Sequence, residues 1–189
     1  SVEECQELHR QFDRKEITHQ EWCDITLSHF SSANLHREQV EEIARHITLL
    51  AGTERTLEEL EAQGVTSYIV SGSIGDVVRA ALGPLCKYFR EVRANEFKYS
   101  RKGYLIDIVG TKYDFEGKAA FISRIANDQR ISPRDILFVG NSINDRFAYL
   151  SGAQTLCLNP RLVDIADPAV WNDCIETCTD LRQILRFVR

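Results

Sequence analysis

The first fifty residues carry hydrophobic positions at helical spacing. Thr18 and Glu21 are separated as in an N-terminal capping box, and apolar residues follow them up to Phe30. A second stripe, with Val40 and Ile43 on one side, predicts a helix from about residue 36 to residue 47. The pattern therefore predicts a small helical domain over residues 1–50.

From Gly52 onward, short apolar runs alternate with helical stripes. Predicted strands cover residues 65–70, 136–139 and 155–158, and residues 96–99 and 104–109 form a predicted hairpin. Predicted helices cover residues 53–63, 117–127, 142–150 and 180–188, and another follows residue 73 and ends at Gly83-Pro84. Alternating strands and helices indicate an α/β fold, a doubly wound parallel sheet over residues 51–189 that carries the helical part as a cap.

Composition and charge exclude several classes of protein. The formal charge of −5 argues against a nucleic-acid-binding protein. No apolar run is long enough to span a membrane, and no signal segment opens the chain. The six cysteines are scattered without a CxxC pair, which favours reduced thiols in a cytoplasmic protein over disulfides or a zinc site.

Ser71 and Gly72 follow the predicted strand at residues 65–70. A hydroxyl and a glycine between a buried strand and a helix are typical of a phosphate-binding turn, because free backbone N–H groups and the helix dipole attract anions. The ordinary alternative is a serine that caps the helix.

Lys118 lies in the first turn of the predicted helix 117–127. A cation is unfavourable at this end of a helix, so its placement suggests that the ammonium reaches an anion such as a phosphoryl group or a carboxylate. The alternative is a lysine that is solvated on the surface.

The stretch Leu-Phe-Val-Gly-Asn-Ser-Ile-Asn-Asp ends the predicted strand at residues 136–139. It presents side-chain oxygens at Asn141 and Asp145, and such hard oxygen ligands suit Mg²⁺. A capping box from Ser142 to Asp145 is the alternative, and it is compatible with a metal site.

Taken in order, these three motifs resemble motifs II, III and IV of the haloacid-dehalogenase-like (HAD) superfamily. The spacing from Gly52 through Gly64 to Ser71-Gly72, the hairpin and the closing helix resemble its phosphoserine-phosphatase branch. The resemblance covers the whole chain and is much stronger after Gly52 than before it.

The resemblance implies a chemistry and a role for each matching residue. HAD phosphatases form an aspartyl-phosphate on an aspartate that ends the first strand, and water then hydrolyses it. By motif match, Ser71 and Gly72 would bind the phosphoryl group, Lys118 would neutralise its charge, and Asn144 would contact phosphate. Asn141 and Asp145 would hold Mg²⁺.

The chain departs from the family pattern in three ways. Motif I, a hydrophobic strand that runs into Asp-x-Asp, is not found, so we expect it upstream of Ser1 or in a second chain. Asn141 stands where an aspartate is usual, which weakens metal binding. The helix around Asp24 lacks the arginine with which phosphoserine enzymes grip the substrate, so phosphoserine is a poor candidate.

The leading hypothesis is therefore a cytoplasmic Mg²⁺-dependent phosphomonoesterase that acts on a small phosphorylated metabolite, with no nucleic-acid or membrane partner. A non-catalytic HAD-like binding or regulatory module is the second reading, favoured by Asn141 and the missing motif I. A flavodoxin-like or receiver-like protein ranks last, because it explains neither the helical start nor the position of Lys118.

Overall fold

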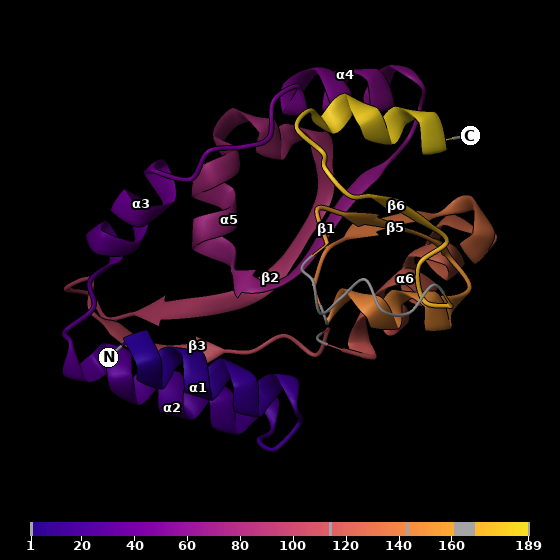
Figure 1. Ribbon diagram of the computed structural model, residues 1–189. Helices are drawn as coiled ribbons and strands as arrows, with labels where there is room; N and C mark the ends of the chain where they lie inside the picture. Colours follow the sequence, from indigo (N-terminus) through magenta and orange to yellow (C-terminus); the bar gives the residue numbers. More distant parts are fainter. Residues whose placement is uncertain (1, 114, 143, 161–168, 189) are drawn as a thin grey trace. The chain divides into compact units, whose positions relative to one another are not determined.

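The computed structural model describes residues 2–113, 115–142, 144–160 and 169–188 (Figure 1). Its contacts divide the chain into two compact units, which we describe separately. Unit 1 comprises Ser1–Thr48, Ser71–Cys86 and Val92–Thr111, and unit 2 comprises Leu49–Val70, Lys87–Glu91 and Lys112–Arg189. The predicted cap helices thus share unit 1 with two later segments, while the division predicted at residue 50 stays a prediction.

Unit 1 contains the helices α1, α2, α3 and α5 and parts of a three-stranded sheet in the order β1-β2-β3. The elements are α1 (Val2–Asp13), α2 (His19–Ser32), α3 (Arg37–Arg45), β1 (Ser67–Ile74), α5 (Gly75–Leu82), the 3₁₀-helix η1 (Gly83–Tyr88), β2 (Phe89–Tyr99) and β3 (Leu105–Val109). Helix α1 packs on α2, and α2 packs on β3 (Figure 1). The predicted capping box is confirmed, because Thr18 and Glu21 each accept a hydrogen bond from the backbone N–H of the other.

Strands β2 and β3 form the predicted hairpin. They pair antiparallel, with Phe97 opposite Ile108 and Tyr99 opposite Leu105, and the register shifts by one residue between these pairs. This bulge at Ile106 lets Leu105 and Ile108, three positions apart, both point into the core, and it leaves Ile106 exposed. Cys23 of α2 and Val40 of α3 complete this core.

Unit 2 contains a parallel sheet in the order β4-β5-β6. Its elements are α4 (Thr53–Ala62), α6 (Gly117–Gln129), η2 (Pro133–Asp135), β4 (Leu137–Gly140), η3 (Asp145–Ser151), β5 (Gln154–Leu158), β6 (Asp173–Ile175) and η4 (Leu181–Phe187). Helices α4 and η4 lie side by side (Figure 1). The predicted α/β architecture with parallel strands and covering helices is confirmed.

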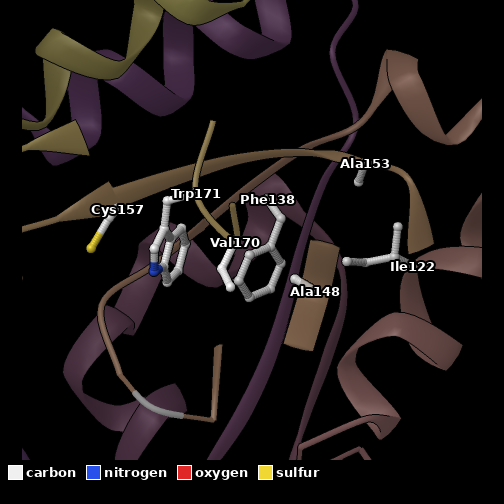
Figure 2. Packing of buried hydrophobic residues seen from close by; sticks show 7 residues of the cluster. All are labelled: Ile122, Phe138, Ala148, Ala153, Cys157, Val170 and Trp171. Atoms are coloured by element: carbon white, nitrogen blue, oxygen red, sulfur yellow. The ribbon is translucent and has the colours of Figure 1, made fainter. Parts of the chain in front are cut away.

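The core of unit 2 fills the space between the sheet and its helices. Ile122 of α6, Phe138 of β4, Ala148 of η3 and Trp171 pack together there, and Figure 2 shows their side chains pointing toward one another. On the other side of the sheet, Leu156 packs with the residues of η4. Burial on both sides explains why β4 and β5 are apolar runs rather than alternating ones.

The two helices predicted near residues 142–150 and 180–188 are present as the 3₁₀-helices η3 and η4, while strand β6 was not predicted. β6 is only three residues long and its first residue is an exposed Asp173, so it carries little strand signal. None of the described helices has both the length and the apolar character that crossing a lipid bilayer requires.

Candidate active site

The start of α6 places Lys118. Gly117 is the first residue of the helix and Lys118 the second, as the sequence predicted. A Cβ atom on Gly117 would lie 2.1 Å from the backbone oxygen of Lys112, so only glycine allows the chain to pass this carbonyl and begin the helix here. The Lys118 side chain is buried, at 4% exposure, and is therefore not a solvated surface lysine.

The buried ammonium of Lys118 has two partners within unit 2. Its Nζ lies 2.9 Å from Asp145 Oδ1 and donates a hydrogen bond of 3.2 Å to the backbone oxygen of Val70. A buried lysine needs an anionic partner, because desolvating an unpaired ammonium is expensive. The positive charge at the unfavourable end of α6 is thus balanced by the carboxylate of η3.

The second carboxylate oxygen of Asp145 is also fully engaged. Oδ2 accepts hydrogen bonds from the Asn141 and Ser142 backbone N–H groups at 2.9 and 3.0 Å, and from the Ser142 hydroxyl at 2.9 Å. Burial raises the pKa of Asp145, but the Lys118 charge and these hydrogen bonds outweigh it and leave the pKa below its usual range. Asp145 is therefore ionised at neutral pH.

Gly140 makes room for this arrangement at the end of β4. A Cβ atom on Gly140 would lie 2.7 Å from both Cβ and Cγ of Asp145. The missing side chain allows Asp145 to fold back over the strand end, where the next two N–H groups point at its carboxylate. The glycine of this motif is thus explained by close packing.

The carboxylates among the described residues do not by themselves offer free ligands for Mg²⁺, and the predicted Mg²⁺ site stays a prediction. Both oxygens of Asp145, one of the two predicted ligands, are already bonded to donors. Within the described ranges, no group of three or more His, Cys, Asp or Glu side chains is arranged to hold a metal ion. The remaining oxygens of this motif belong to neutral amides. Asn141 is exposed, and Asn144 Oδ1 is buried without a hydrogen-bond partner among the described residues.

Ser71 and Gly72 lie in unit 1, and their local structure differs from the prediction. Strand β1 continues through both residues to Ile74, and α5 begins only at Gly75, so Ser71 does not open a helix. The Ser71 hydroxyl instead accepts a hydrogen bond of 3.1 Å from the backbone N–H of Ser73. The prediction that Ser71 opens a helix is therefore wrong, while the predicted phosphate-binding role of Ser71 and Gly72 stays a prediction.

The alternative predicted for Ser142 and Asp145, a capping box, is present in one direction, because the Ser142 N–H donates to Asp145. The Ser142 hydroxyl also donates to this carboxylate and helps to hold it. One further side chain at these motifs was not anticipated from the sequence. Asn95 is 1% exposed and donates from Nδ2 to the Gly72 backbone oxygen at 2.7 Å. The one feature of the sequence that could have indicated a buried Asn95 was its position between the apolar residues Ala94 and Phe97 of a predicted strand region.

Several solved structures are similar to this chain. An apo phosphoserine phosphatase is 26% identical, with a TM-score of 0.71 over 82% of this chain and 74% of its own. A phospho-aspartyl intermediate analogue of phosphoserine phosphatase is 22% identical, with a TM-score of 0.77 over 99% of this chain and 86% of its own. A HAD family hydrolase from Salmonella enterica serovar Typhi is 13% identical, with a TM-score of 0.77 over 97% and 61%.

The fold is that of the HAD hydrolases. Neither a protein-family model nor a curated protein sequence matches the chain. The structural likeness supports the predicted resemblance to the HAD superfamily, since the neighbours are phosphoserine phosphatases and HAD-family hydrolases.

Proposed function

We propose that this protein is a phosphomonoester hydrolase of the HAD type that acts on a small phosphorylated metabolite. The reaction would pass through an aspartyl-phosphate. This intermediate forms when a carboxylate oxygen attacks phosphorus and the ester oxygen leaves. Water would then hydrolyse the acyl phosphate and regenerate the carboxylate. The nucleophilic aspartate is proposed to lie in a segment upstream of Ser1 or in a second chain.

The buried pair of Lys118 and Asp145 is the observation that carries this proposal. An ammonium that is 2.9 Å from its counter-ion and shielded from solvent is a fixed positive charge at the carboxyl end of β4. In open α/β sheets, ligands bind at this edge. A preorganised cation is what phosphoryl transfer requires, since positioning and electrostatics supply most of its catalysis.

Each residue has a proposed role that follows from its bonds. Lys118 neutralises charge on the phosphoryl group and the nucleophile. Asp145 orients Lys118, and its saturated carboxylate argues for this role over direct metal ligation. Ser71 donates a hydrogen bond to a phosphoryl oxygen. Asn144 contacts the phosphate through its amide NH₂, because an amide oxygen cannot donate to an anion.

The edge of β4 supports an additional strand. Among the described residues β4 pairs only with β5, and its sequence Leu-Phe-Val-Gly carries no charge or proline. Natural edge strands usually carry such protective residues, because an apolar open edge recruits other strands. A strand that ends in the nucleophilic aspartate would form backbone hydrogen bonds with this edge of β4.

Mg²⁺ is the proposed cofactor, and it would supply charge neutralisation at the phosphoryl group when bound. Because Asp145 is engaged and Asn141 is neutral, its carboxylate ligands would have to come from the nucleophile segment. Asn141 would add at most one neutral oxygen.

A non-catalytic HAD-like module is the second candidate function, and Asn141 is the observation that favours it. An amide in place of a carboxylate removes one negative charge from the metal side of the motif. Such a module would bind a phosphorylated ligand without hydrolysing it, and Lys118 would serve for binding alone.

The test is hydrolysis of p-nitrophenyl phosphate with and without Mg²⁺, by this chain and by the full gene product. We expect the full gene product to hydrolyse the ester, and this chain alone to be inactive until a peptide with the nucleophile strand is added. Failure of the full gene product to hydrolyse any phosphomonoester of a broad panel would refute the enzymatic proposal. Tight phosphate binding without turnover would then favour the module.

The control must separate lost catalysis from lost folding. Lys118→Met alone leaves the Asp145 carboxylate buried without its cation, so the paired variant Lys118→Met/Asp145→Asn removes both charges together. We expect this variant to fold and to lose at least about 100-fold in kcat, in line with the removal of one electrostatic stabiliser. Lys102→Ala, at an exposed lysine of the hairpin turn, is the matched control and should keep its activity.

A further inference from the structure

A buried asparagine joins the end of the hairpin to the strand that carries Ser71. Asn95 lies in β2 and is 1% exposed. Its Nδ2 donates to the Gly72 backbone oxygen at 2.7 Å, and its Oδ1 accepts from the Thr111 backbone N–H at 2.7 Å. Both bonds lie within unit 1, so one amide side chain connects two backbone segments that are far apart in the sequence.

The bond to Gly72 fixes one side of a single peptide group. The carbonyl of the peptide between Gly72 and Ser73 is held by Asn95, and the N–H of that same peptide donates to Ser71 Oγ at 3.1 Å. Because a peptide group is planar, its carbonyl and its N–H turn together. The orientation of the Asn95 amide therefore decides whether the Ser73 N–H points at the Ser71 hydroxyl.

This bond determines what the Ser71 hydroxyl can do. A hydroxyl has one proton to donate and two lone pairs that accept. The Ser73 N–H occupies an acceptor position of Ser71, and no described residue takes up the Ser71 proton. Ser71 is thereby set as a hydrogen-bond donor, which is the role that an anionic phosphoryl oxygen needs.

We infer that Asn95 is a positioning residue, which holds Ser71 as a donor through the Gly72–Ser73 peptide. This inference rests on the proposed function, because it concerns the phosphoryl-binding role of Ser71. Through Thr111, just beyond the end of β3, the same amide makes the position of Ser71 depend on the β2–β3 hairpin. A displacement of the hairpin end is thus transmitted to the hydroxyl.

The substitution Asn95→Asp tests the inference through the pH dependence of activity. It keeps the shape and the acceptor for Thr111 but exchanges the donor toward Gly72 for a carboxyl oxygen. When protonated, the introduced carboxyl donates to the Gly72 carbonyl as the amide did, and when ionised it repels that carbonyl. Burial raises the pKa of such a carboxyl above its usual value of about 4, by up to 3–5 units.

The measurement is kcat/KM for p-nitrophenyl phosphate from pH 5 to pH 8.5, expressed at each pH as the ratio of variant to wild type. It uses the form of the protein that shows activity. We expect a loss of about tenfold at the alkaline end, the effect of one buried hydrogen bond, and recovery to within about threefold at the acidic end. Asn95→Leu, which cannot donate at any pH, should show no recovery.

Asn159→Asp is the matched control. Asn159 is also a two-bond amide clamp, donating from Nδ2 to the Cys178 backbone oxygen at 3.0 Å and accepting from the Cys178 N–H at 2.6 Å, and it has no bond to the Ser71 segment. The activity ratio of Asn159→Asp to wild type should not change with pH, although the melting temperature of this variant falls.

The possible outcomes are distinguishable. An activity ratio for Asn95→Asp that does not change with pH, together with a lowered melting temperature, overturns the inference and leaves Asn95 a purely structural residue. Absence of phosphatase activity in the wild-type protein refutes the proposed function, and the positioning role falls with it. Recovery at low pH in both Asn95→Asp and Asn159→Asp also overturns the inference, because the effect would then not be specific to Ser71.

Discussion

The strongest prediction concerns the free energy that couples Lys118 to Asp145. We consider three variants: Lys118→Met, Asp145→Asn and the two together. Both side chains are almost enclosed, with exposures of 4% and 13%, and their charged atoms lie 2.9 Å apart. Each single substitution leaves one buried charge without its partner, while the double variant leaves none.

The expected magnitudes follow from this geometry. Breaking a buried ion pair by removing one partner typically destabilises a protein by about 3–5 kcal/mol, because the remaining charge stays desolvated. In Asp145→Asn the amide oxygen can still accept from the Asn141 and Ser142 N–H groups, but its NH₂ group then faces the Lys118 ammonium. In the double variant, methionine fills the volume of the lysine and the amide keeps its backbone bonds. We therefore expect the free energy of unfolding to fall less in the double variant than in either single variant.

The assay is urea unfolding, followed by the fluorescence of Trp171 in the core of unit 2. Trp22, the second tryptophan, lies in unit 1, so the background Trp22→Phe makes the signal specific for unit 2. The four free energies of unfolding give the coupling energy of the pair. We expect a coupling energy of at least about 2 kcal/mol.

Additive losses would refute the reasoning. The two charges do not depend on one another if the free energy of unfolding falls in the double variant by the sum of the two single-variant decreases, within about 0.5 kcal/mol. Lys118 would then be stabilised by the Val70 carbonyl and by solvent, and the description of a fixed cation at the end of β4 would have to be abandoned.

Two predictions remain. The pKa of Asp145 is lowered in the folded state, so its stabilising contribution is complete above its unfolded value of about 4 and is lost as the pH falls through the lower folded value. Urea midpoints measured between pH 6 and pH 2 should thus fall more steeply for the wild type than for Lys118→Met/Asp145→Asn, and equal slopes would contradict this. Gly140→Ala brings a Cβ atom to 2.7 Å from Asp145 and should destabilise unit 2 by about 2 kcal/mol or more and reduce activity. Gly75→Ala, where the added atom meets only the movable end of Arg79, is the control, and a loss there as large as at Gly140 would argue against the packing explanation.

Features with a strong local signal were predictable from the sequence. The capping box of Thr18 and Glu21 forms as expected, because both partners lie within one turn of the helix. The hairpin and the start of α6 at Gly117 likewise depend on residues that are close in the chain. The motif order predicted the HAD-like fold, because each motif ends a strand or begins a helix.

What the sequence could not show depends on contacts between distant segments. Four donors bond to the Asp145 carboxylate. One of them is Lys118, which lies 27 positions earlier in the chain, and the others are close neighbours in the sequence. Asn95 bonds to Gly72 and Thr111, and both lie far from Asn95 in the sequence. The continuation of β1 past Ser71 was missed because Ser and Gly at a strand end signal a turn, while pairing within the sheet can extend the strand through them.

Because all hydrogen-bonding positions used by Asp145 are occupied, the proposed metal and the proposed nucleophile strand depend on one another. The Asp145 carboxylate serves Lys118, so a divalent cation bound at this motif must find its negative ligands on another segment. Among the described residues the second edge of β4 has no paired strand. The proposed nucleophile strand, if it ends beside Gly140, would bring its last side chains toward Lys118 and Asn141. If the proposed function is right, restoring this strand must restore Mg²⁺ binding and turnover together. A peptide that restores one without the other would show that the metal ligands and the nucleophile lie on different segments.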